Sequence, residues 1–173
     1  MTDPALPFLN LPKFETLQEH ARRYPMLDAS AIRASLALRR VGQALESAYD
    51  AHFARHGLSA GRFTVLMMLA KAPDHTLSAG DLAECSSVTR ASMTGLLDTL
   101  EASGLVQREA SPDDRRRILV RLTPAALAQL EAMLPDHFRR TAALMAGLGE
   151  AERETLVTLL GKVASAIPAV LDP

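Results

Sequence analysis

The spacing of hydrophobic residues predicts a chain built mainly of helices. Apolar side chains recur every three or four positions in several segments, which is the pattern of a helix with one buried face. The helices expected from this pattern cover residues 13–23, 30–55, 60–72 and 150–166, together with a long segment that begins at Pro124. We expect Pro135 to kink that long segment, because proline removes a backbone hydrogen bond from a helix interior.

Two shorter helices are marked by their capping residues. Ser78 and Asp81 have the spacing of a capping box, in which the hydroxyl and the carboxylate both accept backbone N–H groups at the helix start. Thr89 is expected to cap the second helix. Gly104, followed by an apolar residue, is expected to end that helix in a Schellman turn.

Strand-like segments follow the two short helices. Residues 105–109 and 117–122 alternate apolar and polar side chains and flank a charged turn, which predicts a two-stranded hairpin. Thr76 and Leu77 are expected to form a short third strand beside it. Helix, turn, helix and charged hairpin, in this order, are typical of a winged helix-turn-helix.

The hairpin contains the most specific sequence pattern, Asp114-x-Arg116-x-x-x-Val120-x-Leu122-Thr123. This pattern and the preceding run LAECSSVTRASMTGLLDTLEASGLV resemble the MarR family of bacterial transcription regulators. The resemblance implies a protein that is mainly α with a small β-hairpin, a winged helix-turn-helix with long N- and C-terminal dimerisation helices. It therefore also implies a homodimer that binds double-stranded DNA.

The same resemblance divides the chain into parts. An N-terminal extension with a short helix, residues 1–28, precedes a MarR-type domain, residues 29–173. Within this domain the DNA-binding lobe is expected over residues 59–123, and the dimerisation helices over 29–56 and 124–167. The chain departs from the family pattern at Ser86, Ser87, Gly95 and Pro135.

The expected DNA contacts come from the second short helix and from the hairpin. The residues are Thr89, Arg90, Ser92, Thr94, Asp114, Arg115, Arg116 and Arg117. Arg90 has the donors to bind guanine O6 and N7. In the resembled family the aspartate of the hairpin orients an arginine that enters the minor groove, which assigns these roles to Asp114 and Arg116. The operator is expected to be pseudo-palindromic, because a two-fold dimer presents two recognition helices.

A small organic effector, an aromatic acid or a phenol, is expected to release the DNA. The residues expected to bind it are His52, His56, Arg62, Phe63 and Met67. The aromatic and apolar side chains would form the wall of a cleft, and the histidines and the arginine would bind a carboxylate.

Three alternatives remain open from the residues alone. His52 and His56 have the i, i+4 spacing of metal ligands, and Cys85 is a candidate redox switch, although we expect it to be a small buried side chain. A winged helix can also serve as a protein-interaction module without DNA specificity. No nucleophile–base pair, carboxylate pair or phosphate-binding loop is recognisable, so we expect neither an enzyme nor a cofactor.

Charge and composition agree with a regulator. The net charge is −1, yet residues 108–121 contain five arginines against three acidic residues, which favours selective and salt-sensitive DNA binding. No apolar run approaches the roughly 20 residues of a membrane span. The N-terminal residues lack the pattern of a signal peptide, and with one cysteine the chain is expected to be cytoplasmic.

Overall fold

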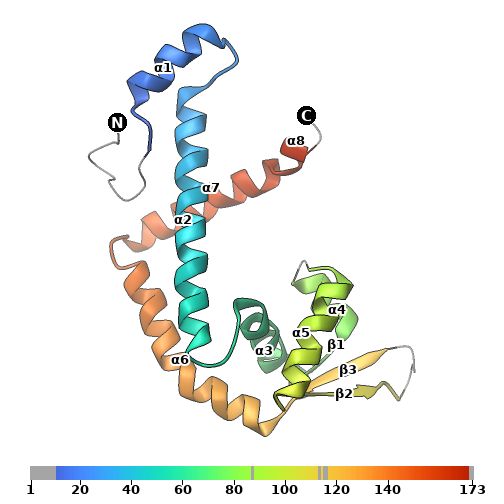
Figure 1. Cartoon of the computed structure of the whole chain (residues 1–173). Coiled ribbons are helices and arrows are strands. Elements are labelled where there is room, and N and C mark those ends of the chain that lie inside the picture. The colour runs from blue at the N-terminus through green and yellow to red at the C-terminus, as the bar shows by residue number, and fades with distance from the viewer. Residues whose placement is uncertain (1–10, 87, 113, 115–116, 172–173) are drawn as a thin grey trace.

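Two parts make up the molecule, a stalk of long helices and a small lobe that contains the sheet (Figure 1). The computed structural model of the 173-residue chain describes residues 11–86, 88–112, 114 and 117–171. The stalk consists of α1 (Phe14–Arg23), α2 (Ala29–Ala54), α6 (Pro124–Leu144), α7 (Glu150–Ala166) and α8 (Pro168–Leu171). The lobe consists of α3 (Ala60–Lys71), η2 (Pro73–His75), β1 (Thr76–Ser78), α4 (Ala79–Cys85), α5 (Arg90–Ala102), β2 (Val106–Ala110) and β3 (Ile118–Leu122).

The three strands form one antiparallel sheet in the order β1-β3-β2. β3 lies in the centre, and its Val120 is opposite Leu77 of β1 and Arg108 of β2. The predicted hairpin and the predicted third strand are therefore confirmed. The helices expected from the hydrophobic pattern begin and end within about one residue of their expected limits. The short helical turns η2 and α8 were not foreseen.

The hydrophobic core of the lobe lies between α3, α4, α5 and the sheet. Its most deeply buried side chains are Val65, Leu66, Leu69, Leu82, Met93, Leu97, Leu100, Val106 and Val120. Met133 of α6 joins the same cluster, which attaches the stalk to the lobe. This packing fixes the orientation of α5, because its buried face leaves only the opposite face for solvent.

Local caps begin and end the helices as predicted. The side chains of Thr89 and Thr123 accept hydrogen bonds from the backbone N–H groups of Ser92 and Ala126, at 3.1 and 3.2 Å. Gly104 has a φ of +70°, and after it the N–H of Leu105 donates to the carbonyl of Leu100 at 2.9 Å. This is the Schellman turn expected after α5.

The capping box predicted at the start of α4 is only half formed. The hydroxyl of Ser78 accepts the N–H of Asp81 at 3.1 Å. The carboxylate of Asp81 instead pairs with Arg117, which comes from β3's side of the hairpin, at 3.2 Å. The prediction of a reciprocal box was wrong because it considered only neighbours in sequence, whereas the folded hairpin brings a guanidinium to the same carboxylate.

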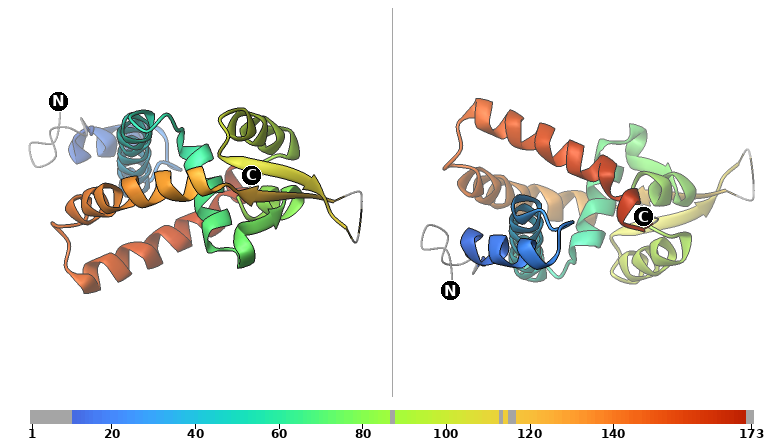
Figure 2. Two further views of the ribbon diagram at one scale, coloured as in Figure 1. Left: turned by 90° about the horizontal axis from the view of Figure 1, so that it is seen from below. Right: turned by 90° about the horizontal axis from the view of Figure 1, so that it is seen from above.

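The helix that contains Pro135 is continuous, and its axis changes direction about midway along α6 (Figure 1). After the turn at 145–149, α7 runs at a wide angle to the second half of α6 (Figure 1 and Figure 2). α7 has no buried residue. Within the described part of the chain, no helix is long and apolar enough to cross a membrane.

Candidate nucleic-acid interface and adjoining cavities

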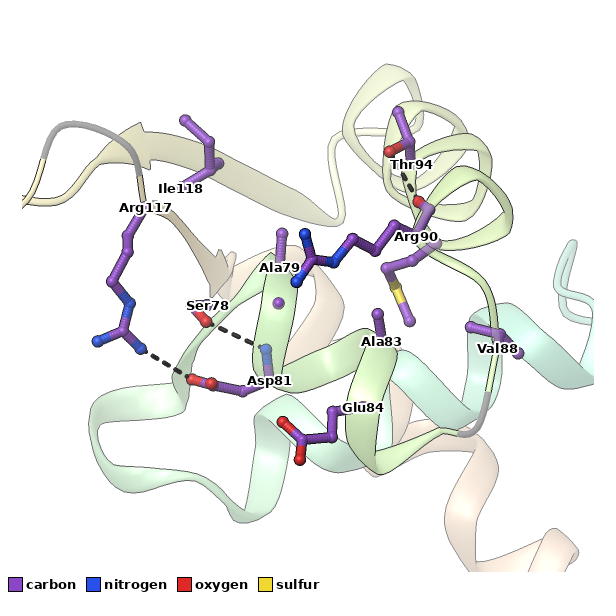
Figure 3. Close-up of a pocket in the computed structure, with 12 residues that line it drawn as sticks. Ser78, Ala79, Asp81, Ala83, Glu84, Val88, Arg90, Thr94, Arg117 and Ile118 are labelled. Atoms are coloured by element: carbon purple, nitrogen blue, oxygen red, sulfur yellow. Dashed lines mark hydrogen bonds and ion pairs between the residues drawn. The ribbon is translucent and has the colours of Figure 1, made fainter.

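A concave surface of about 710 Å³ lies between α4, α5 and the beginning of β3 (Figure 3). Its lining residues are Ser78, Ala79, Gly80, Asp81, Ala83, Glu84, Val88, Arg90, Met93, Thr94, Arg117 and Ile118. Arg90 reaches into this surface from α5, and Arg117 faces it from the hairpin (Figure 3). Two guanidinium groups on facing walls suit a polyanion that lies between the helix and the hairpin.

The outer face of α5 consists of the side chains that were expected to contact DNA. Thr89, Arg90, Ser92 and Thr94 are all exposed, because Met93 takes the buried position between them. The hydroxyl of Thr94 donates to the carbonyl of Arg90 at 3.0 Å. Its oxygen lone pairs therefore remain available to accept a hydrogen bond, while the exposed guanidinium of Arg90 provides donors.

Two of the charged residues expected to contact DNA from the hairpin tip are described by the structure. Asp114 and Arg117 are exposed, whereas Arg115 and Arg116 lie outside the described residues, so their expected DNA contacts stay predictions. Arg117 is held by Asp81, and both side chains are about half exposed, at 56% and 48%. This ion pair connects the base of the hairpin to the first helix of the helix-turn-helix.

A second ionic contact holds α5 against the sheet. The Nε of Arg108 on β2 donates to Glu101 of α5 at 2.8 Å, and its Nη1 lies 2.7 Å from Asp98. The hydrogen bonds from Arg108 lower the pKa of Glu101, and those to Glu101 and Asp98 raise the pKa of Arg108. The sequence did not predict these contacts of Arg108, because Glu101 and Arg108 lie seven positions apart, on either side of the turn after α5.

A larger cavity of about 730 Å³ lies where the stalk meets the lobe. Its lining comes from α2, α3 and α6 and consists of Gly42, Leu45, Glu46, Tyr49, Asp50, Phe53, Ala60, Phe63, Thr64, His137 and Thr141. Phe53 and Phe63 stack with ring centroids 4.4 Å apart, and the ring of His137 lies 4.8 Å from that of Phe63. This aromatic cavity is the place expected for an effector, since it touches both parts of the molecule.

Of the residues expected to bind an effector, Phe63 lines the aromatic cavity and His52 lines a smaller one beside it. Arg62 has its Nε 3.5 Å from the hydroxyl of Ser59, and Met67 packs against the core of the lobe. The ring of His56 lies 5.4 Å from that of His52, centroid to centroid. Arg62, His56 and Met67 are not among the described residues that line either cavity.

Sequence reasoning missed the part of the cavity wall that comes from α6. His137 and Thr141 meet Tyr49 there, and the hydroxyl groups of Tyr49 and Thr141 lie 3.4 Å apart. Tyr49 precedes Phe53 by one helical turn, so the sequence could have predicted an aromatic pair on one face of α2. It could not have predicted the contact with Thr141 of α6, which lies 92 positions after Tyr49.

The two histidines considered for metal binding lie at and just after the end of α2, whereas the cysteine considered as a redox switch lies on α4. Among the described residues, no group of three or more His, Cys, Asp or Glu side chains is placed to hold a metal ion. Cys85 is exposed, so the expectation that it is buried was wrong. It lies at the last position of the short helix α4, where Leu82 and Ala83 take the buried positions.

Comparisons with known proteins agree with this geometry. The MarR family model matches residues 56–117. The transcriptional repressor YetL of Bacillus subtilis is 39% identical over 152 residues, which cover 88% of this chain and 91% of YetL.

Two solved structures are similar in fold and sequence. Bordetella bronchiseptica BpsR, whose DNA binding is regulated by 6-hydroxynicotinic acid, is 31% identical with a TM-score of 0.65, over 73% of this chain and 89% of that one. A cysteine-to-serine mutant of Escherichia coli MarR, complexed with operator DNA, is 26% identical with a TM-score of 0.67, over 78% and 95%. The chain therefore belongs to the MarR family, whose members are DNA-binding winged helix-turn-helix transcription regulators and not enzymes.

Proposed function

We propose that this protein is a homodimeric repressor that binds a pseudo-palindromic operator and is released from it by a small organic effector. The observation that carries the proposal is the position of the aromatic cavity. It lies between the stalk helices α2 and α6 and the lobe helix α3, so a ligand there contacts both parts of the molecule. A ligand that prefers one spacing of stalk and lobe shifts the population toward that spacing.

The apolar surface of the stalk supports the dimer. Exposed hydrophobic side chains gather on α7 and on the segment after it, namely Val157, Leu159, Leu160, Val163, Ile167 and Val170. Phe138 and Leu144 on α6 are also about half exposed or more. Large apolar side chains exposed in such number on neighbouring helical turns are characteristic of a protein interface. A second copy of the chain is the partner that a two-fold operator requires.

Similar proteins support the direction of regulation. YetL is named a repressor, and so is NicR of Pseudomonas putida, which is 32% identical over 131 residues. The regulation of BpsR by 6-hydroxynicotinic acid supports a small ring compound as the effector class.

The test has two parts. Sedimentation of the full-length protein at low micromolar concentration should show a dimer, and fluorescence anisotropy should show tight binding to DNA with two half-sites and weak binding to one. The DNA would be drawn from the region upstream of the protein's own gene. A stable monomer, or equal affinity for one and two half-sites, contradicts the dimeric mode of binding.

Two variants connect the DNA contact and the cavity to this function. Arg90→Ala should reduce the preference for operator over random DNA, because a bidentate arginine–guanine contact contributes about 1–3 kcal/mol of discrimination. Phe63→Leu should leave operator affinity unchanged and raise the effector concentration needed for release. Loss of operator binding in Phe63→Leu would show that the cavity serves the fold and not the effector.

A further inference from the structure

The side chains of α5 have a net negative charge, although this helix is expected to approach DNA. Between Arg90 and Ala102 it contains one arginine, Arg90, and two carboxylates, Asp98 and Glu101, which give a net charge of −1. Both carboxylates lie in the second half of the helix, toward the negative end of its dipole, and the last turn contains no basic residue. Such a helix repels DNA phosphates unless another element supplies a positive charge.

Asp98 lies on the solvent side of α5. It follows Thr94 by one helical turn, and Thr94 follows Arg90 by one turn, so neighbouring turns of the helix present these three side chains. The side chain of Asp98 is 57% exposed, whereas Leu97 and Leu100 take the buried positions beside it. An unpaired carboxylate at Asp98 would therefore lie close to the DNA that Arg90 and Thr94 are expected to contact.

Arg108 of β2 supplies the missing positive charge. Its Nε donates to one oxygen of Glu101 at 2.8 Å, and its backbone N–H donates to the other oxygen at 3.2 Å. Its Nη1 lies 2.7 Å from Asp98. Glu101 thus fixes the position of the guanidinium, which reaches Asp98 from there. With Arg108 counted, the net charge of −1 on α5 becomes zero.

We propose that Arg108 is a positioning residue for DNA binding, which masks the charge of Asp98 so that the outer face of α5 can approach the phosphates. Arg108 is 27% exposed and is not among the described residues that line the concave surface, so it acts through Asp98 and not by touching DNA. The proposal rests on DNA contact through the outer face of α5. It does not depend on repression, on an effector or on the dimer.

A purely structural connection between β2 and α5 would behave differently from charge masking. If Arg108 only held the helix in place, DNA affinity would follow stability in every variant. Masking depends on the charge alone. Arg108→Lys retains the charge but loses the planar guanidinium that binds two carboxylates at once, whereas Arg108→Gln loses both. The two variants should therefore be similar in stability and different in DNA affinity.

The probe is a fluorescent duplex of mixed sequence, titrated with the full-length protein, because repulsion by phosphates does not depend on base sequence. Arg108→Gln should weaken binding at low salt by roughly fivefold to tenfold, the size of one charge interaction near a protein surface. The difference should shrink as salt is added. Arg108→Lys should stay within about twofold of the wild-type affinity. Urea denaturation of the same samples should show both variants folded and less stable than the wild type.

A second substitution tests whether the effect passes through Asp98. Asp98→Asn should restore the affinity of Arg108→Gln to within about twofold of wild type, without restoring its stability, and should have a smaller effect on the wild type. Arg121→Gln is the matched control, since it removes the same charge from the neighbouring strand, where Arg121 pairs with Glu109 at 3.6 Å. It should change the affinity by less than about twofold.

Three results would each overturn the proposal. They are a tenfold loss of affinity in Arg108→Lys, a failure of Asp98→Asn to restore Arg108→Gln, and equal losses in Arg108→Gln and Arg121→Gln. The first of these decides the matter even if Arg108→Gln does not fold. Arg90→Ala in the same assay separates the proposal from the interface on which it rests. Weaker binding in Arg90→Ala together with unchanged binding in Arg108→Gln would retain the contact of α5 with DNA and refute the masking of Asp98.

Discussion

The carboxylate of Asp81 lies 3.2 Å from the guanidinium of Arg117, and this pair joins α4 to the base of the hairpin. Both residues line the concave surface that is expected to receive DNA. We therefore expect Asp81 to compete with DNA phosphates for the same guanidinium. The pair restrains the hairpin in the free protein and can be exchanged for a phosphate contact in the complex.

Asp81→Asn is expected to release Arg117 for phosphate contact. The slope of log affinity against log salt should become steeper by about one unit, since one more charge displaces counterions. Stability should change by less than about 1 kcal/mol, because the pair is exposed. Anisotropy titrations at several salt concentrations measure the slope. Glu84→Gln is the control, since it removes the same charge from the same surface without freeing an arginine, and an equal slope in both variants would refute this reasoning.

Arg108→Ala should destabilise the contact between α5 and the sheet. Arg108 is 27% exposed and binds both Asp98 and Glu101, so its removal should lower the free energy of unfolding by about 1–2 kcal/mol after allowance for solvent screening. Urea denaturation provides the measurement. Arg121→Ala is the comparison, because Arg121 pairs with Glu109 at 3.6 Å on the exposed surface of the sheet and should cost less than about 1 kcal/mol.

Gly95→Ala is expected to stabilise α5. A Cβ at Gly95 meets no atom within 4 Å, and alanine is favoured over glycine in a helix interior by about 1 kcal/mol. The melting temperature should therefore rise. Gly104→Ala should lower it, although a Cβ there also meets open space, because the φ of +70° is unfavourable for any residue with a side chain. If both substitutions lower the melting temperature, a side chain at position 95 is not accommodated in open space, and the prediction is wrong.

Stability should fall below neutral pH because of His52, which is buried, and His137, which is partly buried. Burial lowers the pKa of His52 and of His137 in the folded state. At a pH between the lowered pKa of the folded state and the ordinary pKa of about 6.5, the unfolded chain therefore binds more protons than the folded one. Their contribution to stability is complete above that ordinary value and is lost as the pH falls through this window. His137→Asn should flatten the dependence when urea unfolding is measured from pH 7.5 to 5, and an unchanged dependence in this variant would contradict the reasoning.

Short-range signals predicted the elements and the family. The caps at Thr89 and Thr123 and the glycine turn at Gly104 involve partners within five residues, so the chain can satisfy them wherever the rest of the molecule lies. The same holds for the exposed face of α5, because helical periodicity alone separates Arg90 from Met93. The helices, the hairpin and the exposed face of α5 were therefore readable in advance.

Long-range packing decided the partners of individual side chains. Asp81 was assigned to a cap three residues away, but it binds a guanidinium 36 positions later because the hairpin folds back onto α4. His52 was assigned with Arg62 to one carboxylate site, whereas the packing of α6 on α2 places it beside Arg140. Periodicity states which face of a helix is buried, but it does not state which helix covers that face. The cavities, and the charge within them, therefore follow from the tertiary structure alone.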